Sequence, residues 1–290
     1  MIKPSELIIN PDGSIFHLHL KPENLADTVI LVGDPGRVEM IAAYFDKIEC
    51  SVQNREFKTM TGWYKNRRLS VIATGIGTDN IDIVVNELDA LVNIDLKTRT
   101  IKEDKTSLNL IRIGTSGSLQ ADIPVNSFVI SRKSIGFDGL LNFYEGRNII
   151  ADHEFEQLLL THTQWNNLLA KPYVVNCSEQ LFNEIASEKT VTGINISAPG
   201  FYGPQGRVLR LPLADPNLND KIERFEFLGQ KITNYEMESS AIYGLSKLLG
   251  HEALTICLII ANRATLAANE NYYPYMKSLV EYVLEKLADE

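Results

Sequence analysis

The chain has 290 residues, of which 44% are hydrophobic and 22% charged, as in a globular protein of one large or two ordinary domains. With 37 acidic and 28 basic residues the formal net charge is -9, which disfavours nucleic acid and anionic membrane surfaces as partners. The longest apolar run, residues 253–261, is too short to span a bilayer, which takes about 20 residues. The N-terminal segment carries charges and a Pro-Asp-Gly turn where a secretory signal would be apolar, so we expect a cytoplasmic protein.

Cysteine and histidine usage gives no sign of a disulfide framework or a metal centre. Cys50, Cys177 and Cys257 are odd in number, widely spaced and outside any C-x-x-C pattern, so we expect three reduced thiols. His17 and His19 would share one face of a strand and could bind a metal with a third ligand, but none is visible. We therefore predict no metal site at the two histidines.

Short apolar runs rich in β-branched residues alternate with stretches of helical period, a pattern typical of an α/β layer fold with a central sheet. The predicted strands cover residues 28–32, 69–74, 108–114, 127–131, 173–177, 191–198 and 254–261. The predicted helices cover residues 37–45, 79–92, 152–169, 180–187, 237–249 and 275–287.

Three local patterns refine this picture. The helix 237–249 is the clearest, because its apolar residues recur at helical spacing and Gly250 follows as a C-cap. Residues 57–74 read as a hairpin with its turn near Lys65 and Asn66, and the polar segment 95–107 as a solvated connection. With no repeat and no linker, we predict a single domain over 1–290, a central mixed β-sheet flanked by helices.

Two glycine turns follow predicted strands at 33–37 and 74–80. In the first, Gly-Asp-Pro-Gly-Arg exposes backbone amides at a helix start, so an anion could bind there with Arg37, although a turn of this kind taken alone is structural more often than not. It lacks the spacing and the lysine of a P-loop. The second turn lacks the third glycine of a dinucleotide-binding fingerprint, and we interpret it as close packing.

A third glycine-containing turn is expected at 112–117, where Arg112 stands near the end of an apolar strand. A buried guanidinium needs a carboxylate or a phosphate as partner, so this position favours a ligand or an ion pair. The pattern misses G-x-S-x-G by one residue, and no histidine is placed to activate Ser116. We therefore exclude a serine hydrolase.

Two further segments carry binding chemistry. Aromatic residues precede Gln205 and Arg207 on the loop 201–207, which suits the edge of a planar heterocycle, although an ordinary surface loop has the same composition. Glu236 and Glu238 stand at the start of the clear helix, where carboxylates usually complement the helix dipole. The alternative is that a carboxylate there accepts hydrogen bonds from a diol such as ribose.

Taken together and in this order, seven motifs resemble the nucleoside phosphorylase family, in its uridine phosphorylase branch: GDPGRV, NREFKT, ATGIG, IRIGTSG, FYGPQGR, NYEMESSA and IIANR. The resemblance runs from about Phe16 to the C-terminal helix. It implies an α/β fold with a central mixed sheet and a pentosyltransferase that converts uridine and phosphate to uracil and ribose 1-phosphate in pyrimidine nucleoside salvage and catabolism.

The same resemblance implies roles for individual residues. The implied phosphate ligands are Gly33, Arg37, Arg112, Thr115 and, from a neighbouring subunit, Arg55. The implied ribose ligands are Thr115, Met237, Glu238 and, from the neighbour, His17. The implied base ligands are Gly117, Phe201, Gln205 and Arg207; Arg207, Gln205 and Arg112 are the implied catalytic residues. Purine phosphorylases of the family carry an aspartate after the late strand, where this chain reads Ala261-Asn262-Arg263.

The resemblance also implies no cofactor, phosphate being a co-substrate, and a homodimer as the smallest active unit, with a trimer of dimers as the larger alternative. Glu56 resembles a position that binds a monovalent cation, such as potassium, between subunits of some relatives. Three other functions stay open: a hydrolytic nucleosidase, a phosphorylase of broader pyrimidine specificity, and a catalytically silent nucleoside-binding or storage protein.

Overall fold

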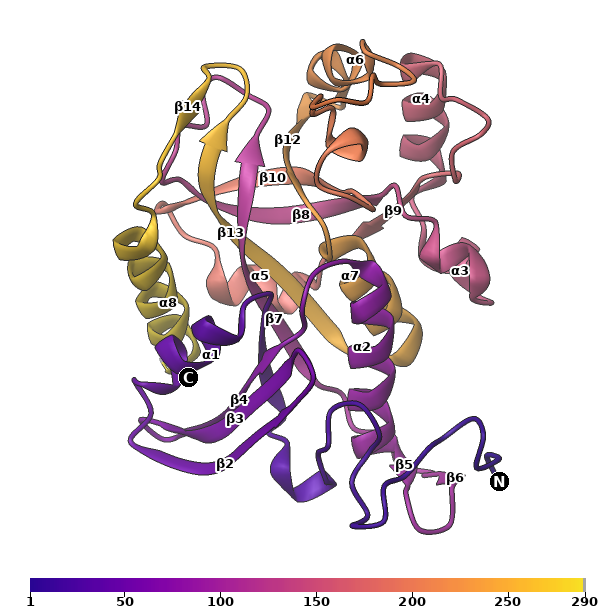
Figure 1. Ribbon diagram of the computed structural model, residues 1–290, viewed down its shortest axis with the longest axis vertical. Helices are drawn as coiled ribbons and strands as arrows, with labels where there is room; N and C mark the ends of the chain where they lie inside the picture. The colour runs from indigo at the N-terminus through magenta and orange to yellow at the C-terminus, as the bar shows by residue number, and fades with distance from the viewer. Residues whose placement is uncertain (289–290) are drawn as a thin grey trace.

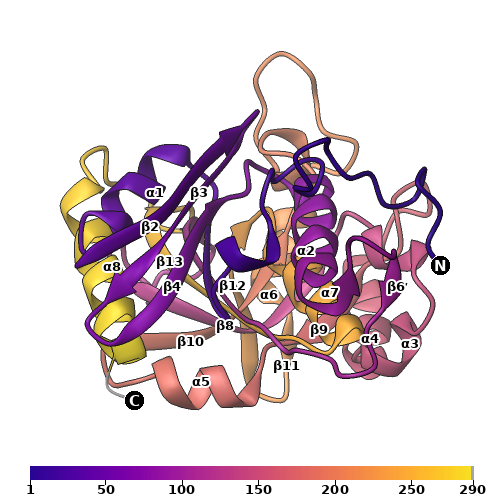
Figure 2. The same cartoon turned by 90° about the horizontal axis from the view of Figure 1, so that it is seen from below.

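A mixed sheet of twelve strands runs through the molecule, and helices cover both of its sides (Figures 1 and 2). This computed structural model describes residues 1–288. The strands of the sheet are β1 (Thr28–Val32), β2 (Lys47–Asn54), β3 (Phe57–Tyr64), β4 (Arg67–Ala73), β7 (Asn109–Ser118), β8 (Phe128–Gly136), β9 (Tyr173–Asn176), β10 (Thr190–Ser197), β11 (Glu226–Phe227), β12 (Gln230–Glu236), β13 (Glu252–Asn262) and β14 (Ala267–Ala268). A separate small hairpin joins β5 (Ile94–Asp95) to β6 (Thr100–Ile101).

The strands lie in the order β11-β12-β10-β8-β13-β7-β1-β4-β3-β2, with β9 beside β8 and β14 beside β13. The central strand β1 pairs in parallel with β4 and β7, whereas β2, β3 and β4 form an antiparallel edge. Strand β12 also pairs with β7 at Tyr235 and Gly117. This extra pairing closes β12, β10, β8, β13 and β7 into a ring, which brings the ends of distant segments together.

The helices lie in two groups: α1 and α8 on one side of the sheet, α2 and α7 on the other (Figures 1 and 2). Asp34 caps α1 by accepting a hydrogen bond from the Gly36 amide at 2.9 Å, and Pro35 occupies the first turn, where its missing N–H costs nothing. The α-helices are α1 (Pro35–Ala42), α2 (Thr78–Asn93), α3 (Arg147–Ile150), α4 (His153–Thr163), α5 (Glu179–Ile185), α6 (Leu218–Arg224), α7 (Ser239–Leu249) and α8 (Tyr273–Ala288). Short 3₁₀ turns cover Pro22–Asn24, Leu140–Phe143 and Gly203–Gln205.

The core forms because both faces of the central strands are covered. All five residues of β1 are buried, which explains why its sequence is a continuous apolar run. The apolar faces of α2, α7 and α8 pack onto this layer. A second cluster contains Phe155, whose ring centre lies 5.1 Å from that of Phe225 and 5.0 Å from that of Phe227, and these contacts anchor α4 to the β11–β12 region.

The predicted single-domain α/β fold with a mixed sheet is confirmed, and so are most of its elements. The hairpin turns at Lys65, which takes a φ of 50°, and Gly250 ends α7 with a φ of 84°. The segment 95–107 is mostly exposed, as expected of a connection, but it contains the β5–β6 hairpin.

Four expectations were wrong. Residues 112–117 form no turn, because β7 continues to Ser118 with partners in β13 and β12. The strand expected at 127–131 runs on to Gly136. The helix expected at 152–169 ends at Thr163, because Gln164 adopts a left-handed conformation with a φ of 52°. His17 and His19 do not share a strand face, since both lie in an irregular N-terminal segment.

Three properties of the chain bear on its class. The cysteines are free, with Cys177 and Cys257 buried and Cys50 partly exposed. Burial raises the pKa of Cys177 to about 11 and that of Cys257 to about 12. Within residues 1–288, no helix has the length and apolar character needed to cross a membrane.

Candidate active site

A cavity of about 340 Å³ opens where the segments after β1 and β10, the middle of β7 and the start of α7 converge. Ten of the twelve ligand residues implied by the sequence line it, and His17 and Arg55 are the exceptions. The full lining is Gly33, Asp34, Arg37, Ile76, Arg112, Thr115, Ser116, Gly117, Phe201, Gln205, Arg207, Tyr235, Glu236, Met237, Glu238, Ile260 and Ala261. Residues from opposite ends of the chain therefore form one site.

Arg112 and two glutamates form the buried centre of the cavity. Nη2 of Arg112 pairs with Glu238, and its Nη1 lies 3.5 Å from Glu236 Oε2. All three side chains are buried. Burial opposes the charge of Arg112, but Glu238 and Glu236 outweigh it and hold the pKa of Arg112 above its ordinary value. Arg112 therefore stays cationic, and its Nε has no partner among residues 1–288.

Gly114 explains how a strand can hold this arginine. A Cβ at position 114 would collide with the guanidinium of Arg112, which folds back over its own strand, and would lie 3.0 Å from Cys257 Sγ. The motif Arg-Ile-Gly is thus a signal for an arginine lying flat on β7, and its glycine clears the space.

The anion side of the cavity is formed by Gly33, Arg37 and Thr115. Arg37 extends from the first turn of α1, and its Nη1 donates to the carbonyl of Ile113 at 3.2 Å. Burial lowers the pKa of Arg37, and the nearby Arg112 acts in the same direction. No carboxylate in the described part of the chain lies within 4.0 Å of the Arg37 guanidinium, so a bound anion is the natural counter-charge for it.

The two glutamates beside α7 have different tasks. Glu236 accepts hydrogen bonds from Asn195 Nδ2 at 2.7 Å and from the amides of Glu238 and Ser239, so it caps the helix. Glu238 accepts from the Gly77 amide at 2.8 Å and faces the cavity. Burial raises the pKa of Glu238, Arg112 lowers it and Glu236 raises it, with a net rise. The helix-capping alternative therefore holds for Glu236, and Glu238 is the carboxylate left facing the cavity.

Phe201, Gln205 and Arg207 form the other wall of the cavity. The guanidinium carbon of Arg207 lies 3.7 Å from the centre of the Phe201 ring, and its Nη1 donates to Gln205 Oε1 at 2.7 Å. Gln205 is buried although the loop around it is exposed. Burial, together with the nearby Arg263, lowers the pKa of Arg207 to about 10.

Arg263 lies behind the cavity and contacts Gln205, and the sequence reasoning assigned it no role. Its Nη2 donates to Gln205 Oε1 at 3.2 Å, its Nη1 donates to the Gln205 carbonyl, and its guanidinium lies 5.2 Å from the Tyr235 ring. The oxygen of the Gln205 amide is thus occupied by two arginines, and its NH₂ group is left to donate to a ligand. Arg263 directly follows the late strand, and only the fold brings it against Gln205.

His17 and Arg55 lie outside the cavity, where the N-terminal segment that carries His17 contacts the β2–β3 turn that carries Arg55. Asn54 Nδ2 donates to the carbonyl of His17 at 2.8 Å, and the guanidinium of Arg55 lies 5.9 Å from the Phe16 ring. Arg55 has a φ of 53° and is exposed at the β2–β3 turn. Neither side chain lines this chain's own cavity.

Ser116, Glu56 and the metal-ligating residue types are the candidates for other chemistry. Ser116 Oγ donates to the Tyr235 carbonyl at 2.7 Å and accepts from Asn234, so it is a structural hydroxyl. Glu56 is exposed beside Arg55. In the stretch from residue 1 to 288, no group of three or more His, Cys, Asp or Glu side chains is arranged to hold a metal ion.

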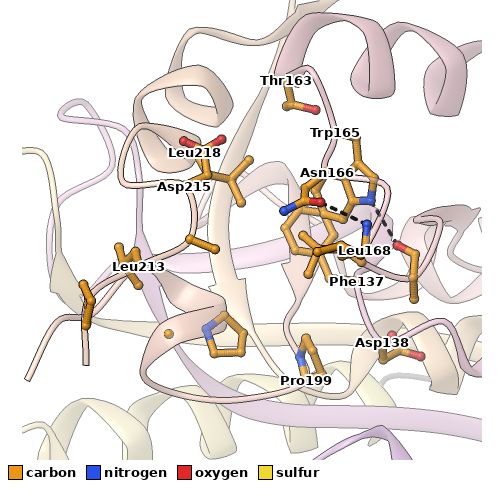
Figure 3. Close-up of a pocket in the computed structure, with 16 residues that line it drawn as sticks. Phe137, Asp138, Thr163, Trp165, Asn166, Leu168, Pro199, Leu213, Asp215 and Leu218 are labelled. Atoms are coloured by element: carbon orange, nitrogen blue, oxygen red, sulfur yellow. Dashed lines mark hydrogen bonds between the residues drawn. The ribbon is translucent and has the colours of Figure 1, made fainter. Parts of the chain in front are cut away.

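A second, largely apolar hollow of about 440 Å³ lies behind the loop that carries Gln205 (Figure 3). Phe137 and Trp165, whose ring centres are 4.6 Å apart, form one wall, while Pro199, Pro204 and Leu213 belong to the loop side. The loop 201–207 thus separates two hollows instead of resting on packed core.

Comparison with known proteins agrees with this architecture. The family model described as Phosphorylase superfamily matches residues 27–288. A Trypanosoma brucei nucleoside phosphorylase, whose crystal structure is described as showing uridine phosphorylase activity, superposes with a TM-score of 0.88 at 31% identity, covering 98% of this chain and 100% of that one.

Sequence relatives include enzymes named for both base classes. Uridine phosphorylase of Thermococcus kodakarensis is 28% identical over 260 residues, which cover 88% of this chain and 79% of that protein. The DeoD-type purine nucleoside phosphorylase of Listeria welshimeri is 30% identical over 244 residues, covering 84% and 85%. With its fold, its buried arginine–glutamate centre and these relatives, the chain belongs to the phosphorylase superfamily, as a member of the nucleoside phosphorylase family.

Proposed function

We propose that this protein is a uridine phosphorylase, which converts uridine and phosphate to uracil and ribose 1-phosphate. The observation that carries the proposal is the joint presence of Gln205, Arg207 and Phe201 in the same cavity as Arg37, Arg112 and Glu238. Identity to relatives does not choose the base, because uridine and purine enzymes match this chain equally well. The choice therefore rests on the side chains that would face the base.

The base wall favours a pyrimidine with carbonyl groups. Arg207 and the amide nitrogen of Gln205 are donors, which suit the oxygens of uracil, and the Phe201 ring offers a flat surface for stacking. Ala261 lines the cavity where purine enzymes of the family carry an acid. Asn262 cannot replace that acid, because its amide donates to the carbonyls of Gln120 and Ile123 at 2.8 Å.

The chemistry follows from where charge develops. A phosphate oxygen attacks C1′ of the ribose, the C1′–N1 bond breaks, and its electron pair leaves with the uracil. Arg37 and Arg112 hold the phosphate, whose negative charge stabilises the oxocarbenium character of the sugar, while Glu238 accepts hydrogen bonds from the ribose hydroxyls. Arg207 and Gln205 donate to the uracil oxygens, on which negative charge grows.

His17 and Arg55 complete the site of a second copy of the chain in this proposal, which makes a homodimer the smallest active unit. Both are displaced from their own cavity and held on one shared surface, as a pair acting on a neighbour requires. Full activity of a monomer fraction isolated by size-exclusion chromatography would contradict this part of the proposal.

The test is the loss of uridine absorbance with purified protein, with and without phosphate, beside a parallel reaction with inosine. We expect conversion of uridine only with phosphate, and little or none of inosine. Equal conversion without phosphate would identify a hydrolytic nucleosidase. No conversion of either nucleoside, with uridine binding retained in calorimetry, would identify a binding protein; thymidine and 2′-deoxyuridine as further substrates define the breadth of pyrimidine specificity.

A further inference from the structure

Glu87, on the side of α2, makes a set of contacts that the proposed chemistry does not use. Its Oε1 lies 2.6 Å from Nδ1 of His17 and 3.0 Å from the His17 backbone nitrogen. Its Oε2 accepts from the amide of Leu18 at 2.8 Å. A single carboxylate therefore holds both the ring of His17 and the backbone that carries it.

The setting of this carboxylate is half enclosed. The side chain of Glu87 is 13% exposed and that of His17 is 27% exposed, so one edge of the ring stays open to a ligand. The rings of Phe16 and Phe57 lie 4.8 and 6.4 Å from the imidazole, both edge-on. Figures 1 and 2 show the N-terminal segment passing beside α2, which is how Glu87 reaches it.

We propose that Glu87 is a positioning residue: it fixes the orientation and the tautomer of His17, so that Nε2 accepts a hydrogen bond from a sugar hydroxyl bound in a neighbouring subunit. This inference rests on the proposed function. A carboxylate facing Nδ1 makes that nitrogen the donor, and in the neutral ring Nε2 is then the acceptor. A ribose hydroxyl is the donor that fits it.

Helix α2 connects the Glu87–His17 pair to the chain's own cavity. Its N-cap residue, Gly77, donates its amide to Glu238 at 2.8 Å. Glu87 follows ten residues later, about 15 Å along the helix axis. One rigid helix therefore sets both the ribose carboxylate of its own site and the histidine presented to the other site, which fixes the spacing between the two.

Glu87→Gln is the sharpest test, because it keeps the shape of the side chain. The amide oxygen can still accept from the backbone of Leu18, but the NH₂ group then faces Nδ1 of His17 and makes Nδ1 the acceptor. Nε2 becomes a donor. We expect KM for uridine to rise about 2- to 10-fold with kcat and KM for phosphate little changed.

Asp89→Asn is the matched control, since Asp89 lies on the same helix and 3.2 Å from a different histidine, His251. We expect it to leave KM for uridine unchanged. In the His17→Ala background, adding Glu87→Gln should cost nothing further. An additional rise in KM for uridine in that background would overturn the proposal, because Glu87 would then act through another group.

A second readout does not depend on turnover. The ring nitrogens of ¹⁵N-labelled histidine report the tautomer by NMR, and the His17→Ala spectrum assigns His17 among the five histidines. We expect Nε2 to be unprotonated in the neutral ring of the wild type and protonated in Glu87→Gln. The same tautomer in both proteins would refute the role of Glu87 even if the enzyme proved inactive on uridine, whereas inactivity of the wild type with the expected tautomer change would refute only the proposed function.

Discussion

The two walls of the cavity are built in opposite ways. On the side proposed to bind phosphate and sugar, Arg112, Glu236 and Glu238 are 5%, 4% and 3% exposed and stand on or next to paired strands of the sheet. On the side proposed to bind the base, Phe201 is 50% exposed and Arg207 is partly exposed on a loop backed by the hollow of Figure 3. We call the first side the fixed wall, because paired strands hold its residues, and the second the loop wall, because its residues lie on the loop 201–207.

This difference separates two parts of the proposed chemistry. Holding phosphate and stabilising a cationic sugar demand fixed charges in a dry site, and a strand with partners on both sides supplies them. Recognising a base demands only a few donors and a flat ring, which a loop can vary without disturbing the sheet. We therefore expect changes in the fixed wall to impair both stability and catalysis, and changes in the loop to impair catalysis alone.

The largest effect is expected for Arg112→Met. It leaves two buried glutamates without their cation, so we expect stability to fall by about 3–5 kcal/mol and kcat to fall by about 10³-fold. Urea unfolding and steady-state kinetics measure the two effects. Arg112→Lys keeps the charge and should recover stability better than activity, because lysine lacks the planar, two-pronged donor. Normal turnover by the folded Met variant would contradict the fixed-wall assignment.

Arg207→Ala should separate the walls most clearly. We expect kcat to fall on the order of 10²-fold, because Arg207 meets charge that develops only as uracil leaves. The thermal unfolding temperature should stay within about 1 °C of the wild type, since the side chain is partly exposed and its hydrogen bonds stay within its own loop. Undiminished turnover would remove Arg207 from the mechanism.

For the fixed wall, the sequence predicts the charge pairing of Arg112 better than the backbone conformation around it. The prediction that a buried Arg112 needs an anionic partner is confirmed, because burying an unpaired charge is costly in any fold. The turn around Arg112 was expected because glycines such as those at 114 and 117 usually break strands, and this expectation was wrong. Here Gly114 clears space for the guanidinium, and the pairing of β7 with β12 involves residues more than a hundred positions apart. No local pattern carries that information.

The residues of the loop wall were assigned through the resemblance, but the Arg263 contact and the hollow behind the loop were not predicted. Phe201, Gln205 and Arg207 line the cavity as expected. Arg263 was passed over because a lone arginine after a strand has no distinctive spacing, and only the fold brings it against Gln205. Helix α4 ends at Thr163 because Gln164 is left-handed, although glutamine is an ordinary helix former. The segment that forms the hollow behind the loop could therefore not be recognised locally.

Phosphate binding offers a third test of the division. In Arg37→Met we expect KM for phosphate to rise about 10- to 100-fold, from the loss of a charge-assisted hydrogen bond, with KM for uridine close to the wild-type value. Phosphate should also raise the unfolding temperature of the wild type and of Arg207→Ala, but much less that of Arg37→Met. Loss of this protection in Arg207→Ala instead would show that the loop binds phosphate.

The smallest effect is expected for Phe201→Leu, which keeps an apolar side chain but removes the ring beneath Arg207. The guanidinium carbon lies 3.7 Å from the ring centre, and a partly exposed contact of this kind contributes about 0.5–1 kcal/mol, so we expect kcat/KM for uridine to fall about 2- to 5-fold. Phe201→Tyr keeps the ring and should restore most of the activity. The Leu and Arg207→Ala changes should be less than additive when combined, because both remove the same contact. Full additivity would mean that Phe201 acts on the base alone and that the guanidinium needs no ring to hold it in place.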